Sequence, residues 1–213
     1  MDVSLDLSAI ICAICTAITT LGGGWFVYNQ HTKNKLTDLK IERFKANEKA
    51  KNYKRSENTS KVFGELYKIM IATNADRVYI VQPHPLGHIA FFSIQFEVKA
   101  NGVEGMRMYV QKLEMSEVPL FSKQLTEHIF MYFDDIDNEV EDRVAKSLLS
   151  SNGTKAVAIK RLNSSRDWVG SIFCEFLDKP EMTKDEIHKT LHDAALNIQF
   201  NLPEYQDNEF DKF

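Results

Sequence analysis

Carboxylates are concentrated in one short stretch of this 213-residue chain. Six of the nine residues from 134 to 142 are acidic, namely Asp134, Asp135, Asp137, Glu139, Glu141 and Asp142. Such clusters supply the oxygen ligands that hard cations prefer, but a calcium loop also needs a turn-forming glycine and a distant bidentate glutamate, which this stretch lacks. We therefore interpret it as a solvated acidic loop leading into a helix N-terminus, where negative charge is favourable, and we predict no metal site.

Two pairs of histidines have spacings at which imidazoles could share a metal. His188 and His192 are one helical turn apart, but the zincin pattern needs a glutamate directly after the first histidine, where this chain has Lys189. His84 and His88 bracket a Pro-Leu-Gly turn. We interpret the first pair as flanking the core face of a helix and the second as turn residues, so neither pair predicts a catalytic metal.

No other motif supports catalysis. The sequence has no glycine-rich phosphate loop, no nucleophile elbow and no kinase or hydrolase signature. Cys174 lies in a strand-like run and is the one cysteine beyond residue 28, so we expect a small buried thiol and no disulfide framework. Cys12 and Cys15 have the spacing of a redox motif without its strand and helix context. We expect a protein that is not an enzyme, and we assign it no cofactor.

An uncharged run from Ser8 to Tyr28 predicts a transmembrane helix. At about 1.5 Å per residue, a helix of roughly 21 residues reaches about 31 Å, close to the hydrocarbon thickness of a bilayer. A cleavable signal peptide would need a basic segment before the run and a small-residue cleavage site after it, whereas Asp2 and Asp6 precede it and bulky residues 25–28 close it. We therefore expect a permanent single-pass anchor.

The charges that flank the run predict its orientation. No lysine or arginine precedes it, and the basic residues just beyond it are Lys33, Lys35, Lys40, Arg43 and Lys45. The positive-inside rule then places the body in the cytoplasm at the inner (cytoplasmic) membrane. Residues 33–55 hold nine basic and three acidic residues, a net charge of +6, and each such charge near anionic lipid contributes about 1 kcal/mol of attraction. We expect membrane lipid as a partner and no nucleic acid, which would also require base-stacking aromatics.

Small, weakly polar residues recur at every fourth position of the predicted span: Ser8, Cys12, Thr16, Thr20 and Gly24. Such a stripe lets two helix backbones approach closely in lipid. The same residue types are also common in spanning helices that do not associate, so both readings stand. Self-association of the chain into a homo-oligomer is our prediction.

The rest of the chain predicts an α+β body with helices packed on an antiparallel sheet. We divide the chain into a short N-terminal tail (1–7), the transmembrane helix (8–28), a charged helical linker (29–58), a domain (59–202) and an acidic tail (203–213). Within the domain, apolar spacing and turn residues predict helices from Val62, before Asn152-Gly153 and after Thr183, with strands at 77–82, 92–98, 154–162 and 168–177. The alternation in 92–98 predicts a strand with one buried face. The middle is less regular, with a short helix near 122–127 and a strand at 129–133.

This order of elements resembles a GAF domain over about residues 55–202. The resemblance is best from Leu148 through the strand 154–162, the polar turn and the Gly170-containing strand to the capped last helix, and residues 75–80 look like the family's first strand entry. It implies a GAF/PAS-like antiparallel sheet with the two terminal helices on one face and the middle segment on the other. The polar motifs or the cysteine that hold ligands in nucleotide-binding and bilin-binding members cannot be matched here.

If a ligand pocket exists, the resemblance implies that it lies between the sheet and the middle segment. The aromatic residues expected near it are Tyr79, Phe92, Phe96, Tyr109 and Phe133. The alternative is that these aromatics are ordinary core.

The layout of the chain also resembles the lysis holin of T-even phages, which has one N-terminal span, a helical linker and a small α/β domain. This chain departs from it because the span begins almost at residue 1 and the basic linker indicates a cytoplasmic body. Two hypotheses follow. The first is a membrane-anchored, non-catalytic GAF-like module for sensing or for binding a protein partner not identified by the sequence. The second is a phage lysis protein of holin type with a soluble regulatory domain.

Overall fold

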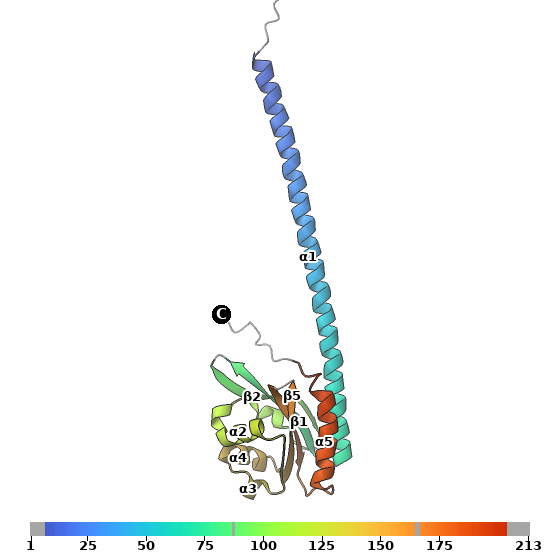
Figure 1. Cartoon of the computed structure of the whole chain (residues 1–213), viewed down its shortest axis with the longest axis vertical. Coiled ribbons are helices and arrows are strands. Elements are labelled where there is room, and N and C mark those ends of the chain that lie inside the picture. Colours follow the sequence, from blue (N-terminus) through green and yellow to red (C-terminus); the bar gives the residue numbers. More distant parts are fainter. Residues whose placement is uncertain (1–6, 87, 165–166, 204–213) are drawn as a thin grey trace, which may run out of the picture. The chain divides into compact units, whose positions relative to one another are not determined.

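The computed structural model describes residues 7–86, 88–164 and 167–203 (Figure 1). Before Tyr28 it describes the side chains of only a few residues. The chain divides into two compact units, residues 1–54 and 55–213, and we take each by itself.

A single helix, α1 (Leu7–Thr73), forms the described part of the first unit and continues into the second. The backbone at 8–28 and in the linker is therefore helical, as predicted. Among the residues that the structure describes, no helix combines the length and the apolar character needed to cross a bilayer. Most side chains of the predicted span lie outside the described residues, including Ser8, Cys12, Thr20 and Gly24 of the small-residue stripe.

The second unit is built on a six-stranded antiparallel sheet with the strand order β3-β2-β1-β6-β5-β4. This confirms the predicted α+β fold. The strands are β1 (Arg77–Leu86), β2 (Ile89–Lys99), β3 (Gln111–Glu114), β4 (Phe130–Phe133), β5 (Ala156–Ser164) and β6 (Asp167–Phe176). The helices after α1 are α2 (Pro119–Glu127), α3 (Ile136–Glu139), α4 (Arg143–Ser151) and α5 (Lys184–Ile198), with short 3₁₀ turns η1 (Met106–Met108) and η2 (Met115–Glu117).

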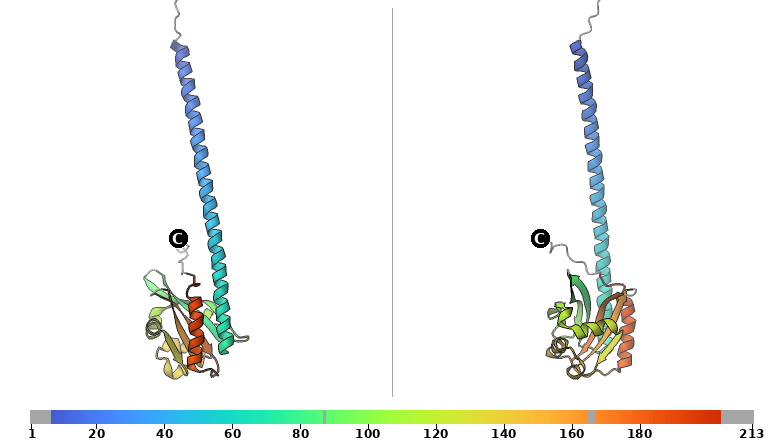
Figure 2. Two further views of the ribbon diagram at one scale, coloured as in Figure 1. Left: turned by 45° about the vertical axis from the view of Figure 1, so that its right-hand side comes forward. Right: turned by 60° about the vertical axis from the view of Figure 1, so that its left-hand side comes forward.

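Each face of the sheet carries its own hydrophobic core. The last turns of α1 and all of α5 cover one face, and α2, α3 and α4 cover the other (Figures 1 and 2). We call the first the α1/α5 core; it includes Val62, Leu66, Ile80, Ile172, Cys174 and Leu191. The second, the α2–α4 core, includes Tyr79, Phe92, Ile94, Leu125, Leu149 and Phe173. This is the arrangement that the GAF resemblance implies.

The ends of the helices follow the predicted capping patterns. Thr183 and Glu186 form a reciprocal capping box at the start of α5. Gly153, just beyond α4, has φ +79°, a left-handed conformation that suits a glycine after a helix. In the acidic stretch, Asp135 and Asp142 accept hydrogen bonds from backbone N–H groups at the starts of α3 and α4. Part of that acidity therefore stabilises helix N-termini.

The prediction of one buried face for strand 92–98 is wrong. Phe92 and Ile94 lie in the α2–α4 core, whereas Phe96 and Val98 lie in the α1/α5 core. The register with β1 runs from Ile80↔Phe96 to Val81↔Ile94, which leaves Gln95 unpaired in a β-bulge. One extra residue reverses the faces to which all later side chains point.

Strand β1 continues through Pro83 and Pro85, where we had predicted a turn. In an inner strand, successive backbone N–H groups donate alternately to the two neighbouring strands. A proline has no N–H to donate. Among the described residues, β1 pairs with β6 only as far as Val81↔Ser171, and beyond that point it pairs with β2 alone. The prolines therefore lie where one edge of β1 has no strand in register with it.

Cys174 is a buried thiol in the α1/α5 core, as predicted, and its Sγ lies 3.5 Å from Thr73 Oγ1. Burial raises the pKa of the Cys174 thiol to about 12. A thiol in the unfolded chain releases its proton near pH 9. Above that pH, proton release favours the unfolded chain over the folded one. The stability that comes from the neutral thiol should be complete below pH 9 and lost between about pH 9 and pH 12.

We therefore expect the stability of fragment 55–213 to fall between pH 8 and pH 10 more steeply than that of its Cys174→Ala variant. Urea unfolding at half-unit pH intervals measures both slopes, and the cavity left by alanine lowers the variant's stability by an amount that does not depend on pH. Parallel curves would show that the thiol does not contribute.

Candidate functional site

Four polar side chains meet within the second unit on the α2–α4 side of the sheet. Arg77 and Tyr79 come from β1, Glu175 from β6 directly opposite Arg77, and Thr154 from the connection between α4 and β5. None of the four is more than 4% exposed. Because polar groups at such positions must find partners within the protein, this buried polar cluster is the most demanding polar arrangement in the described domain.

The Glu175 carboxylate is the centre of the cluster. Its Oε2 accepts hydrogen bonds from Arg77 Nε at 2.8 Å and from Thr154 Oγ1 at 2.8 Å, and lies 2.6 Å from Arg77 Nη2. Its Oε1 accepts a hydrogen bond from the Tyr79 hydroxyl. Both carboxylate oxygens are therefore satisfied by donors within the domain.

Arg77 also ties the sheet to the segments that cover it. Its Nη1 donates to the carbonyl oxygen of Glu104 at 3.0 Å, and its Nη2 donates to that of Asn152 at 3.1 Å. Glu104 lies in the connection after β2, and Asn152 caps the end of α4. One guanidinium thus joins two strands and two connections that are far apart in the sequence.

Burial sets the protonation behaviour of this cluster. Burial raises the pKa of the Glu175 carboxyl, while the Arg77 charge and the hydrogen bonds donated by Tyr79, Thr154 and Arg77 oppose that rise. Burial and the neighbouring Glu175 carboxylate also raise the pKa of the Tyr79 hydroxyl well above its usual value. Because its groups are buried and paired with one another, the cluster joins the sheet to the segments that cover it.

The structure brings together three of the five aromatics predicted near a pocket. Tyr79 and Phe92 lie in the α2–α4 core, and Phe133 packs against it. Tyr79 stacks on Phe173 with ring centroids 5.1 Å apart, and Phe92 meets the edge of Trp168 at 5.8 Å. Tyr79 and Phe92 thus pack against other aromatic rings of this core, at the position where the resemblance places a ligand.

The other two aromatics lie elsewhere. Phe96 is on the opposite face, where its ring meets Phe63 at 5.4 Å, because of the bulge at Gln95. Tyr109 is 43% exposed, and its hydroxyl donates to Glu104 Oε1 at 2.7 Å.

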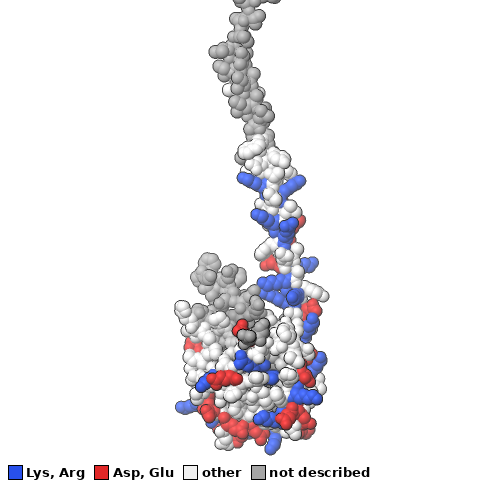
Figure 3. Space-filling model, in the orientation of Figure 1, with Lys and Arg blue, Asp and Glu red and all other residues white. Residues whose placement is uncertain are grey.

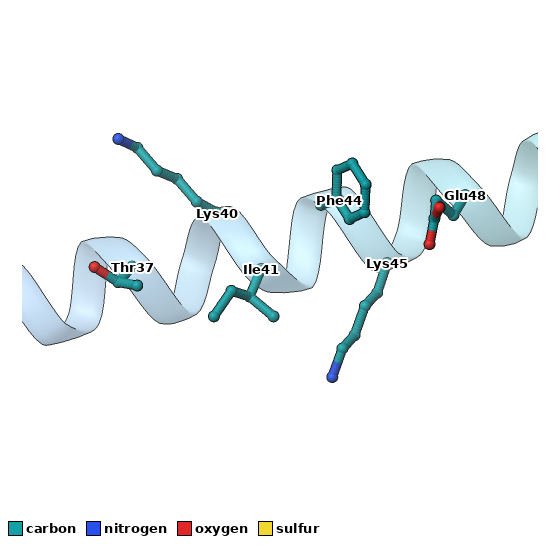
Figure 4. A pocket seen from close by; sticks show the side chains of 6 residues that line it. All are labelled: Thr37, Lys40, Ile41, Phe44, Lys45 and Glu48. Carbon is teal, nitrogen blue, oxygen red and sulfur yellow. The ribbon is translucent and has the colours of Figure 1, made fainter. Parts of the chain in front are cut away.

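The structure exposes all five predicted membrane-surface residues on α1, namely Lys33, Lys35, Lys40, Arg43 and Lys45. Figure 3 shows Lys and Arg side chains along this helix. A shallow apolar surface lies among them, lined by Thr37, Lys40, Ile41, Phe44, Lys45 and Glu48 (Figure 4). All six residues belong to one helix, and no described residue of another element contributes to the lining. These residues therefore enclose no site for a small ligand.

Sequence analysis did not find the buried polar cluster, because Arg77 and Glu175 are 98 positions apart and pairing between strands cannot be deduced from one sequence. A usable indication was present. Arg77 and Glu175 are charged residues within apolar strand runs, and such residues need a buried partner.

No family profile and no curated protein sequence matches this chain. Solved structures do. It is similar to the PixJ GAF domain of Thermosynechococcus elongatus in its blue-light absorbing form, with 14% identity and a TM-score of 0.55 over 69% of this chain and 88% of that one. It is also similar to GAF3 of Slr1393 from Synechocystis sp. PCC6803, with 13% identity and a TM-score of 0.55 over 67% and 90% of the two chains.

A third similar structure is the GAF domain/HD domain protein of Geobacter sulfurreducens, with 12% identity and a TM-score of 0.52 over 69% of this chain and 95% of that one. At these identities the likeness concerns the fold and not the ligand. The α+β unit of this chain has the fold of a GAF domain.

Proposed function

We propose that this chain is a membrane-anchored, non-catalytic GAF-like module that self-associates and binds a protein partner in a sensing or signalling role. The observation that carries the proposal is the contrast between the two faces of the domain. The side on which a GAF ligand would lie is filled by side chains, whereas the outer surface of the two terminal helices exposes large apolar residues.

The filled side favours protein interaction over small-molecule sensing. Tyr79, Phe92 and Phe173 are 3% exposed or less, and the polar groups beneath them are paired with one another. A ligand would have to displace these aromatics and separate their stacked rings, at a cost of several kcal/mol.

The outer surface of α1 and α5 favours association. The two helices lie side by side (Figures 1 and 2), and Asn197 of α5 donates to Glu65 of α1 at 3.5 Å. Four large side chains on or just after these helices are at least half exposed, namely Tyr67, Ile71, Leu196 and Phe200. A groove of about 240 Å³ lined by polar and apolar residues runs between the helices. A second copy of the same helix pair could cover such exposed apolar side chains.

Residues 55–73 and the predicted span belong to the same helix, so association in the membrane and association of the domains would reinforce each other.

The full chain in detergent micelles is expected to form a dimer or larger species that chemical crosslinking detects. Ile71→Glu should reduce the crosslinked fraction several-fold, because the charge would be buried in the interface. Met108→Glu, which changes an 86% exposed residue on η1, is the matched control and should leave crosslinking unchanged. Equal crosslinking in all three proteins would remove this surface from the proposal.

The anchor and the orientation are proposed on sequence grounds, from the uncharged run 8–28 and the exposed basic residues after it. Alkaline phosphatase fused after residue 60 should be inactive in bacteria, and a fluorescent protein fused there should be bright. An active phosphatase would reverse the orientation and favour the holin hypothesis, for which the comparisons provide no support.

A further inference from the structure

A second group of polar side chains lies under α5, on the opposite face of the sheet from the buried polar cluster. Lys160 of β5 pairs in register with Phe130 of β4 at the edge of the sheet. The His188 ring of α5 stacks on Phe130, with centroids 4.1 Å apart and an angle of 24° between the planes. The His192 ring lies one turn further along α5, 6.4 Å from His188. Two elements thus bring an ammonium and two imidazoles to one place.

The donors of this group lack acceptors. His188 Nε2 is buried and has no hydrogen-bond partner among the described residues. Lys160 is only 4% exposed, and its ammonium forms no ion pair within the described part of the chain. His188 Nε2 is thus an unpaired buried nitrogen, whereas the Lys160 stem is buried and its ammonium reaches solvent beside the helix.

The local charge is positive. The charged and titratable groups that act on His188 are Lys160 from β5 together with His192, Lys184 and Asp185 from α5. Burial, Lys160 and His192 lower the pKa of His188, and Asp185 alone among these groups raises it. Burial also lowers the pKa of Lys160. Three basic groups and one carboxylate therefore act on His188, and the Lys160 ammonium would repel a metal cation.

We propose that Lys160, His188 and His192 form a binding site for a phosphate-type oxyanion. The ammonium comes from the sheet and the two imidazoles from the helix, and donors from two elements can surround a tetrahedral anion. A planar carboxylate is better matched by the flat fork of an arginine, and no arginine is among the groups that act on His188. His192 is exposed, which leaves one side of the site open to solvent. This inference does not depend on the proposed function.

The anion should bind more tightly as the pH falls. In the free protein the lowered pKa keeps His188 neutral at pH 7. A bound anion favours the imidazolium, which donates from Nε2 and also places its charge over the Phe130 ring. Proton uptake therefore accompanies binding, and affinity should rise several-fold between pH 8 and pH 6.

Nuclear magnetic resonance of the full chain in detergent micelles, with ¹³C-labelled histidine, tests the site. Inorganic phosphate should raise the pKa of His188 by about one unit relative to chloride at equal ionic strength. His128, exposed at the end of α2, serves as the internal control and should not respond. Lys160→Met should abolish the response, and Lys155→Met, which removes an exposed lysine just before β5, should keep it.

Thermal unfolding of the same proteins separates binding from a purely structural role. Without phosphate, Lys160→Met should raise the melting temperature because it removes a desolvated charge, and added phosphate should then no longer raise it. An equal response of His188 and His128 would indicate general screening and overturn the site. An unchanged pKa of His188, or a response retained in Lys160→Met, would also overturn the site. An equal response to acetate would overturn it as well, because it would assign a carboxylate in place of the phosphate-type anion.

Discussion

Replacing Arg77 by Met is expected to lower the free energy of unfolding of fragment 55–213 by about 3–5 kcal/mol. The side chain is completely buried, and its loss leaves the Glu175 carboxylate without a cation. The carbonyl oxygens of Glu104 and Asn152 lose a donor at the same time. Each buried acceptor left without a donor adds its own desolvation cost.

Urea unfolding followed by circular dichroism measures the loss. The matched control is the double variant Arg77→Met/Glu175→Met, which removes both charges and replaces them with apolar side chains. It should be more stable than Arg77→Met alone, because replacing a buried ion pair by apolar groups is often neutral, whereas removing one partner is not. If Arg77→Met cost less than about 1 kcal/mol, the ion pair would not lock the layers of the domain together.

The second large effect is expected from Ile80→Asp, which should cost at least about 4 kcal/mol and abolish cooperative unfolding of the fragment at room temperature. Ile80 is 0% exposed and lies in β1, between Phe96 of β2 and Ile172 of β6. Its neighbours on that face are apolar, so a carboxylate there would have no cation to pair with.

Ile129→Asp provides the control because it introduces the same charge at a residue that is 64% exposed, just before β4. It should change the free energy of unfolding by less than about 0.5 kcal/mol, as ordinary surface substitutions do. A cooperative transition of Ile80→Asp close to that of the parent fragment would contradict the position of β1 at the centre of the sheet.

Local patterns in the sequence predicted the elements that depend on local interactions. The capping box at Thr183 and the left-handed Gly153 act within a few residues, so their residue types indicate the helix ends directly. The order of helices and strands was sufficient to suggest a GAF-like fold.

Features that depend on distant strands were not predicted. The bulge at Gln95 is set by the register between β1 and β2, and the alternating pattern of residues 92–98 continues through it without interruption. The Arg77–Glu175 pair and the free edge beside Pro83 likewise depend on where β6 lies and where its pairing with β1 ends. No periodicity in one strand identifies such partners, so the pairing of Arg77 with Glu175 could be found only in three dimensions.

The separation of Arg77 and Glu175 has a consequence for the order of events during biosynthesis. Glu175 is 98 residues behind Arg77, so at ribosomal rates of about 5–20 residues per second its partner arrives roughly 5–20 s later. Until then β1 lacks its neighbour β6, and one edge of the β1–β2 hairpin is unpaired. A nascent chain interrupted before residue 175 would therefore present an unpaired arginine and an open strand edge, which are features that chaperones and proteases recognise.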